Sequence, residues 1–137
     1  MSKVEIYFDG ASRNNPGPAG AGGVIKEDGR VVKKYHRYLG KKTNNEAEYL
    51  AALLGVRVVK KLGLRPSQLV FIGDSSLVIE QLAGKFKIKN GRLKKLHWQV
   101  REEILSLGSG GVDFRHIERA KNSQADKLAN QAIDEKG

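Results

Sequence analysis

The chain has 137 residues, which predicts one domain, residues 1–137, that can bury its own core without disulfides or oligomerisation. It has no cysteine and no run of about 18 uncharged apolar residues, which excludes a disulfide scaffold, thiolate chemistry and an ordinary membrane helix. Its 25 lysines and arginines against 15 acids give a formal charge of +10, which favours a polyanionic partner, nucleic acid first, over a merely solvated surface.

The first predicted strand covers residues 3–12, where β-branched and aromatic side chains alternate with polar ones. Asp9 is anomalous in this strand, because a carboxylate in so apolar a run must be solvated, hydrogen-bonded or bound to a cation. A plain turn at Asp9-Gly10 is the competing interpretation, since Asp-Gly is typical of hairpins. Two more predicted strands, residues 20–26 and 30–39, flank a second Asp-Gly pair and complete an antiparallel meander.

A capping box marks the start of the first predicted helix. Thr43 supplies the cap, and Glu46 three residues later completes the box. The apolar stripe that follows is wide enough to predict a largely buried helix. Its main members are Ala47, Leu50, Ala51, Leu54 and Val58.

The remainder of the chain alternates strands with helices. Residues 68–73 and 112–117 are predicted strands, and residues 76–83, 93–107 and 123–135 are predicted helices. The strand at 68–73 is almost continuously apolar, as is typical of a central parallel strand. The order β-β-β-α-β-α-α-β-α predicts an α/β fold with a five-stranded mixed sheet. In it a three-stranded antiparallel meander joins two parallel strands, with helices on both faces.

Four acids stand where this topology brings them towards one edge of the sheet: Asp9, Glu48, Asp74 and Asp126. Each of the last three also has a structural interpretation, which is a helix-dipole contact for Glu48, an N-cap for Asp74 and a capping-box variant for Asp126. Four carboxylates so close would repel one another unless divalent cations lay between them, and an all-oxygen site suits Mg²⁺ or Mn²⁺. A basic protein with a local acidic cluster is typical of a metal-dependent nuclease.

Four motifs, in this order, resemble those of the type 1 ribonuclease H family: Tyr7-Phe8-Asp9-Gly10-Ala11-Ser12 with Asn15-Pro16-Gly17, Thr43-Asn44-Asn45-Glu46-Ala47-Glu48, Gly73-Asp74-Ser75, and His116 with Asn122 to Ala129. The match runs from the first predicted strand to the last predicted helix. The resemblance implies a ribonuclease H-like fold and an endonuclease that hydrolyses the RNA strand of RNA/DNA hybrids, leaving 3′-hydroxyl and 5′-phosphate ends.

The resemblance also implies a catalytic role for each of the four acids. Two Mg²⁺ ions per site are implied, with Mn²⁺ as a possible substitute. Asp9 would ligate both ions, Asp126 would help to hold the ion that carries the attacking water, and Glu48 and Asp74 would hold the other ion.

Two residues compete for an auxiliary catalytic role. His116 stands ten residues before Asp126, the family's spacing for a loop histidine that assists catalysis or product release. Arg119 is the alternative, because members with His-x-x-Arg place an arginine there. A purely structural histidine at the end of a strand is the competing interpretation of His116.

Substrate contacts are implied at polar positions that line the family's hybrid groove: Ser12, Asn15, Thr43, Asn44 and Asn45. Some members carry an extra basic helix, the basic protrusion, whereas this short form has only residues 84–91 there. Three lysines in this link, Lys85, Lys87 and Lys89, either contact phosphates or form a solvated charge run.

Two other functions stay open on the sequence alone. One is a nuclease of the same fold that acts on double-stranded RNA or DNA junctions, since fold does not fix substrate. The other is a non-catalytic basic nucleic-acid-binding module that uses the acids as helix caps. We expect a soluble, cytoplasmic monomer with no membrane segment and no obligate protein partner, in which His36 and His97 are surface or packing residues.

Overall fold

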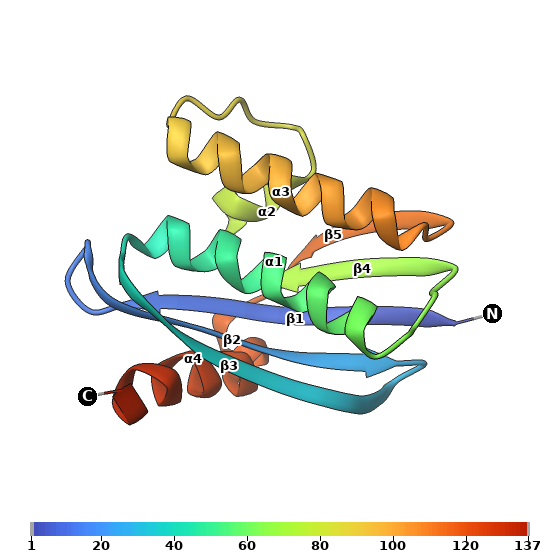
Figure 1. Ribbon diagram of the computed structural model, residues 1–137, viewed down its shortest axis with the longest axis horizontal. Coiled ribbons are helices and arrows are strands. Elements are labelled where there is room, and N and C mark those ends of the chain that lie inside the picture. Colours follow the sequence, from blue (N-terminus) through green and yellow to red (C-terminus); the bar gives the residue numbers. More distant parts are fainter. Residues whose placement is uncertain (1, 137) are drawn as a thin grey trace.

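Five strands form one mixed sheet, in the order β3-β2-β1-β4-β5, in the computed structural model, which describes residues 2–136 (Figure 1). The strands are β1 (Lys3–Ser12), β2 (Gly17–Glu27), β3 (Arg30–Lys42), β4 (Gln68–Gly73) and β5 (Gly111–His116). The helices are α1 (Asn44–Lys61), α2 (Ser76–Leu82), α3 (Gly91–Leu107) and α4 (Ser123–Lys136), and the 3₁₀ turn η1 (Arg119–Asn122) precedes α4. β1, β2 and β3 pair antiparallel, whereas β4 pairs in parallel with β1 and β5, which confirms the predicted sheet.

Helices cover both faces of this sheet, as predicted. α1 packs on β1 with α3 beside it, and α4 lies on the opposite face against β2 (Figure 1). The core between α1 and the sheet contains large side chains with almost no exposed surface, among them Ile6, Phe8, Tyr49, Leu69 and Phe71. Burial of each contributes roughly 1.5–3 kcal/mol to folding, so this layer fixes how α1 lies on β1. No helix among residues 2–136 combines the length and apolar character needed to cross a bilayer.

The two Asp-Gly pairs adopt different structures. Asp28 and Gly29 have φ angles of 49° and 86°, as the type I′ turn of a two-residue hairpin requires. Asp9 and Gly10, by contrast, lie inside β1, which continues to Ser12. The competing interpretation of Asp9-Gly10 as a turn is therefore wrong, because β2 pairs with β1 through both residues.

Three element ends differ from the sequence prediction by two residues or more. β2 begins at Gly17 and β3 ends at Lys42, three residues outside the predicted ends, because the two strands pair with each other over the glycine-rich start of β2. Local strand propensity gives no sign of this pairing. α3 begins at Gly91 rather than at Leu93, because the Asn90 side chain caps it by accepting hydrogen bonds from the next backbone amides.

Gly10 allows α1 to lie directly on β1. A Cβ atom at this position would fall 2.2 Å from the carbonyl carbon of Ala47, far inside van der Waals contact. Glycine therefore permits the first turn of α1 to approach the backbone of β1. At this contact Glu48 Oε1 accepts a hydrogen bond of 2.8 Å from the Gly10 amide.

We expect Gly10→Ala to lower the free energy of unfolding by about 1–3 kcal/mol or more, because the helix must move away from the strand. Urea denaturation measures the change. Gly91→Ala is the matched control, since a Cβ there meets no atom within 4 Å, and it should stay within about 0.5 kcal/mol of wild type. Equal stability of the two variants would show that the close approach at Gly10 is not a constraint.

Candidate active site

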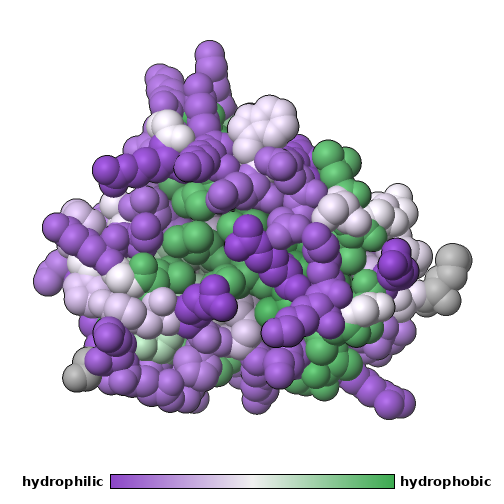
Figure 2. Space-filling view, viewed as in Figure 1, coloured by the Kyte–Doolittle hydropathy of each residue, from purple (hydrophilic) through white to green (hydrophobic). Residues whose placement is uncertain are grey.

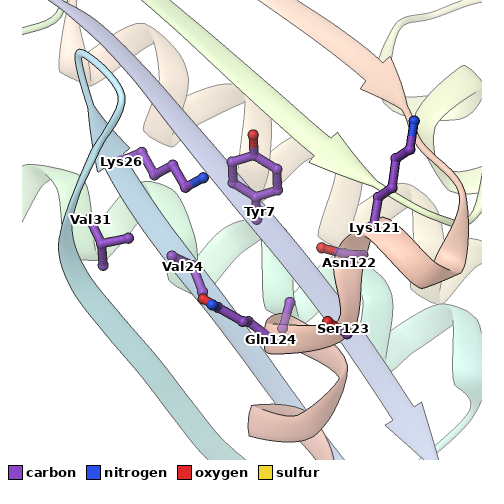
Figure 3. Close-up of a pocket in the computed structure, with 9 residues that line it drawn as sticks. Tyr7, Val24, Lys26, Val31, Lys121, Asn122, Ser123 and Gln124 are labelled. Atoms are coloured by element: carbon purple, nitrogen blue, oxygen red, sulfur yellow. The ribbon is translucent and has the colours of Figure 1, made fainter.

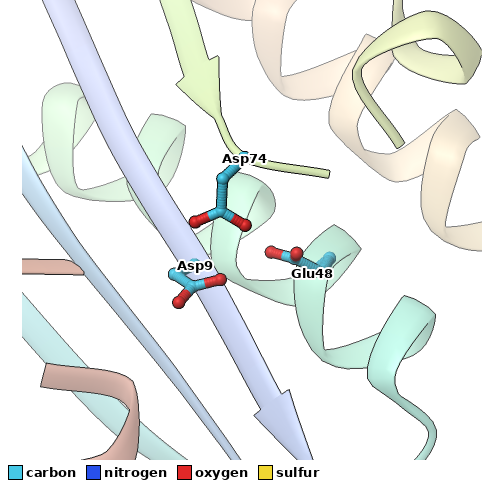
Figure 4. Close-up of side chains that lie close together, drawn as sticks. All are labelled: Asp9, Glu48 and Asp74. Atoms are coloured by element: carbon cyan, nitrogen blue, oxygen red, sulfur yellow. The ribbon is translucent and has the colours of Figure 1, made fainter. Parts of the chain in front are cut away.

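Three carboxylates converge beyond the end of β4 (Figure 4). Asp9 comes from β1, Glu48 is the fifth residue of α1, and Asp74 is the residue that follows β4. One oxygen of each carboxylate lies within 4.8 Å of the others. Asp9 and Glu48 are only 3% and 7% exposed, so this group is largely removed from water. We call these three residues the carboxylate cluster.

The carboxylate cluster lies where β1 extends beyond its neighbouring strand β4. The pairing of β1 with β4 ends at Tyr7 and Ile72, but β1 continues to Ser12. From residue 8 onward β1 therefore has β2 on one side and no strand on the other. Backbone groups along such an edge need other hydrogen-bond partners when they are buried.

Side chains from distant parts of the chain supply these partners. Asn122 Nδ2 donates to the Phe8 carbonyl at 2.9 Å, Glu48 Oε1 accepts from the Gly10 amide at 2.8 Å, and Asn44 Oδ1 accepts from the Ser12 amide at 3.0 Å. They bind alternate residues of β1, as a neighbouring strand would. These hydrogen bonds attach α1 and η1 to the free edge of β1. The bond to the Gly10 amide also holds Glu48 next to Asp9.

Asn122 is a site residue to which the sequence analysis assigned no role. It is 2% exposed, and its Nδ2 atom donates to Asp74 Oδ2 at 3.1 Å as well as to the Phe8 carbonyl. It therefore fixes Asp74 relative to β1. The sequence around it, Lys121-Asn122-Ser123-Gln124, is polar throughout, so no local pattern indicates that this one side chain is buried.

A pocket of about 210 Å³ lies beside Asn122 on the α4 side of the sheet (Figure 3). Tyr7 and Lys26 line it, and Lys26 Nζ lies 4.8 Å from the centroid of the Tyr7 ring. None of the three clustered carboxylates lines this pocket. The pocket therefore adjoins the site through Asn122 but is not the place where the acids meet.

Burial and nearby negative charge make Asp9 and Glu48 hold protons more tightly than free carboxyl groups. Burial, followed by the charge of Asp74 and a hydrogen bond with Asp126, raises the pKa of Asp9 to about 8. Burial, followed by the charge of Asp9, raises the pKa of Glu48 well above its usual range, although the Gly10 amide acts in the opposite direction. Ionisation of the whole cluster at neutral pH therefore needs a compensating positive charge.

Helix capping does not account for the clustered acids. Ser75, not Asp74, caps α2, because its side chain accepts from the Val78 amide at 3.3 Å. Glu46, not Glu48, completes the capping box with Thr43. The N-cap interpretation of Asp74 is thus wrong, and the capping-box prediction for α1 is confirmed.

Asp126 lies beside the cluster rather than within its closest group. It is in the first turn of α4, where its Oδ1 atom accepts a hydrogen bond from Asn130 Nδ2 at 3.3 Å. Its hydrogen bond and negative charge both raise the pKa of Asp9, so the two carboxylates are neighbours. The structure brings the other three predicted acids together and places Asp126 at their edge.

The two candidates for an auxiliary role lie next to each other but differ in their contacts. His116, the last residue of β5, is exposed, and its Nε2 atom lies 3.2 Å from the backbone carbonyl of Asp74. Arg119 is exposed in η1, and it makes no ion pair within residues 2–136. His116 is therefore tethered to the cluster, whereas the Arg119 side chain is not.

The predicted substrate contacts near the site form a connected network. The Asn44 amide donates to Asn15 Oδ1 at 2.9 Å, and the Ser12 hydroxyl oxygen lies 2.8 Å from the Asn14 carbonyl and 2.7 Å from the Lys42 carbonyl, within hydrogen-bond distance of both. These bonds fix the turn between β1 and β2 against the start of α1. Asn15, which follows β1, and Asn44, which begins α1, are both exposed.

The remaining predicted residues lie apart from this network or add little to it. Asn45 is half-buried in the first turn of α1. Lys85, Lys87 and Lys89 are exposed on the link between α2 and α3, and Lys85 Nζ lies 3.8 Å from Glu80. Of the two histidines predicted as surface or packing residues, His36 Nε2 lies 2.9 Å from Glu135 Oε1, and His97 is half-buried on α3.

The donor set of the cluster fits a divalent cation that prefers oxygen. Carboxylate oxygens are the ligands of Mg²⁺ and Mn²⁺ in proteins, and three of them already face one another within 4.8 Å. A bound cation would also remove the repulsion that raises the pKa values of Asp9 and Glu48.

Known proteins resemble this chain over nearly its whole length. Residues 7–132 match the family described as "Reverse transcriptase-like". The bifunctional protein Rv2228c of Mycobacterium tuberculosis is 38% identical over 134 residues, which make up 96% of this chain but 36% of that protein. Ribonuclease H of Albidiferax ferrireducens is 33% identical over 98% of this chain and 96% of its own length.

A solved structure adds a match in three dimensions. The crystal structure of LC11-RNase H1 in complex with RNA/DNA hybrid has a TM-score of 0.91 and 34% identity, and the match covers 97% of this chain and 98% of that one. The chain thus spans about a third of the mycobacterial relative and nearly all of the ribonuclease H chains.

Without divalent cations, we expect the melting temperature to fall as the pH rises from about 4 to about 8. The folded state holds the Asp9 proton up to a pKa of about 8, whereas the unfolded state releases it near 3.8, so stability present at the lower pH is lost across this window. Mg²⁺ should raise the melting temperature more at pH 8 than at pH 5, because it binds the ionised cluster. Thermal melts in EDTA and in Mg²⁺ measure both effects.

Asp9→Asn is the control for this experiment. It removes the titrating group, so in EDTA at pH 8 it should melt above wild type and respond less to Mg²⁺. A wild-type protein whose melting temperature rises with pH in EDTA, or ignores Mg²⁺ at pH 8, would contradict the interpretation.

Proposed function

Because the chain belongs to the type 1 ribonuclease H family, we propose that it is a metal-dependent endoribonuclease that hydrolyses the RNA strand of RNA/DNA hybrids. The observation that carries this proposal is the carboxylate cluster, in which Asp9, Glu48 and Asp74 meet from three separate elements. The similarity to a structure named as a complex with RNA/DNA hybrid supports the substrate. The products would be 3′-hydroxyl and 5′-phosphate ends, and residues 1–137 would make up one ribonuclease H domain.

In the proposed mechanism the four acids together hold two metal ions. When bound, two divalent ions, Mg²⁺ or Mn²⁺, would activate a water molecule and stabilise the leaving oxygen of an in-line displacement. Asp9, between the other acids, would bind both ions. Asp126 would help to hold the ion that carries the attacking water, and Glu48 and Asp74 would hold the ion nearer the leaving group. The Asn122 amide keeps Asp74 oriented, because it donates to Asp74 Oδ2.

The hybrid would lie across the start of α1 and the turn between β1 and β2. Ser12, Asn15 and Asn44, which share the network beside the cluster, are proposed to contact it, together with Thr43 and Asn45 on either side of Asn44. Such groups can bind 2′-hydroxyls, and the N-terminus of α1 can receive a phosphate. The lysines of the α2–α3 link, Lys85, Lys87 and Lys89, and the formal charge of +10 would add affinity that weakens with salt.

The two alternative functions predict different results in a cleavage assay. A same-fold nuclease for double-stranded RNA or DNA junctions would cut those substrates in preference to a hybrid, and a non-catalytic binding module would cut none. The raised pKa values of Asp9 and Glu48 favour a metal-binding role over that of helix caps. The monomeric state, the absence of an obligate protein partner and the cytoplasmic location stay predictions.

We expect the wild-type protein to cleave a labelled RNA/DNA hybrid in Mg²⁺ and to leave double-stranded RNA and DNA largely intact. Asp9→Asn should fold and bind the hybrid but lose nearly all turnover, at least about 10³-fold, because the ligand shared by both ions is gone. Glu135→Gln is a charge-matched control at an exposed site and should cleave as wild type does. Wild-type turnover by Asp9→Asn would end the assignment.

Steady-state kinetics of His116→Ala and Arg119→Ala separate the two auxiliary candidates. Because His116 is tethered to Asp74 and Arg119 is free to reach the substrate, we expect Arg119→Ala to lower kcat more, by about tenfold or greater. The reverse order would assign the role to His116. If neither variant lowers kcat, the segment after β5 is structural only.

A further inference from the structure

A second concave surface lies between α3 and the link that precedes it, apart from the carboxylate cluster. This hollow has a volume of about 360 Å³, and its lining includes Phe86, Lys87, Ile88, Lys94, His97 and Trp98. In Figure 1 the link runs over α3, on the side of the molecule away from α4. No residue of the carboxylate cluster lines it, and of its lining residues only Lys87 belongs to the lysines proposed to add affinity for the hybrid.

Two aromatic side chains border this hollow and are open to solvent. Trp98 is 66% exposed and Phe86 is 53% exposed, although both have large apolar surfaces that gain free energy when covered. A single exposed apolar residue is ordinary, but a pair at the rim of one hollow marks a surface where a flat ligand can bind. Ile88 forms part of its floor and is itself buried.

The charge around the hollow selects an anionic ligand. Residues 84–101 contain seven lysines and arginines and no acid. Lys87 and Lys94 line the hollow itself. Lys85, by contrast, lies 3.8 Å from Glu80, so its charge is partly compensated. Hydrophilic side chains stand out from this upper part of the surface in Figure 2.

We propose that this hollow binds an unpaired nucleotide of single-stranded nucleic acid, with the base against Trp98 and Phe86 and the phosphate near Lys87 and Lys94. In a duplex each base already stacks on its neighbours, so only an unpaired base offers a free face to an aromatic ring. Aromatic side chains beside lysines are how proteins bind single strands without reading their sequence. A single-stranded segment next to a hybrid would supply such a nucleotide, and binding here does not depend on hydrolysis.

The chain offers a direct probe, because Trp98 is its only tryptophan. Titration with an oligothymidylate or oligouridylate of about eight nucleotides, in EDTA, should quench tryptophan fluorescence saturably. Added salt should weaken the binding, because phosphates release counterions. The two oligonucleotides show whether DNA, RNA or both are bound, and neither contains a hybrid, so the result is independent of the proposed hydrolysis.

Variants test the assignment to this hollow by anisotropy of a fluorescein-labelled oligonucleotide. Trp98→Ala should raise Kd about fivefold or more, Trp98→Phe should stay within about twofold, and Lys94→Ala should weaken binding and its salt dependence. Leu105→Ala is the matched control, because Leu105 is an apolar residue of α3 that is 78% exposed and does not line the hollow. It should bind as wild type does.

Three results would overturn the proposal. One is that neither oligonucleotide quenches Trp98. Another is that Trp98→Ala binds the labelled strand as tightly as wild type. The third is that tryptophan fluorescence changes with protein concentration alone, which would show that a second copy of the chain covers the aromatic pair.

Discussion

The repulsion between carboxylates buried at the free edge of β1 is the constraint on which the site depends. Asp9 and Glu48 are almost fully buried, and an oxygen of each lies within 4.8 Å of an Asp74 oxygen. Burial, followed by like charges this close, raises the pKa of Asp9 to about 8, so the arrangement costs stability whenever the acids are ionised without a cation. The ionised cluster therefore lowers the stability of the fold unless a positive charge is bound beside it.

The rest of the fold keeps the cluster together against this repulsion. β4 stops at Gly73, which leaves the last residues of β1 without a neighbour on that side. Side chains of α1 and η1 then bind the free backbone groups, and Gly10 lets α1 approach closely enough for Glu48 to do so. The same hydrogen bonds that complete the sheet therefore also position the acids. A group of acids that fits a cation and the completion of the sheet are two consequences of one local arrangement.

Much of this could be predicted from sequence, because the signals are local or follow from topology. Hydrophobic periodicity and capping residues locate every helix and strand to within a few residues. The order of the elements predicts that four acids converge, and Asp9, Glu48 and Asp74 do so with Asp126 beside them. The role of Asn122 could not be predicted in this way, because it depends on two hydrogen bonds to residues far away in the chain. Its neighbours in the sequence are polar, so the sequence gives no sign that this side chain is buried. Likewise, the exposure of Trp98 depends on how α3 packs, which residue type alone does not reveal.

The titration of the Asp9 carboxyl carbon, followed by NMR in EDTA and in Mg²⁺, tests this account most directly. In EDTA the pKa of Asp9 should lie near 8, because it is buried beside Asp74 and Glu48. In Mg²⁺ it should fall below its ordinary value, because the cation stabilises the ionised form. An ordinary pKa in EDTA that Mg²⁺ leaves unchanged would show that the acids neither repel one another nor share a cation.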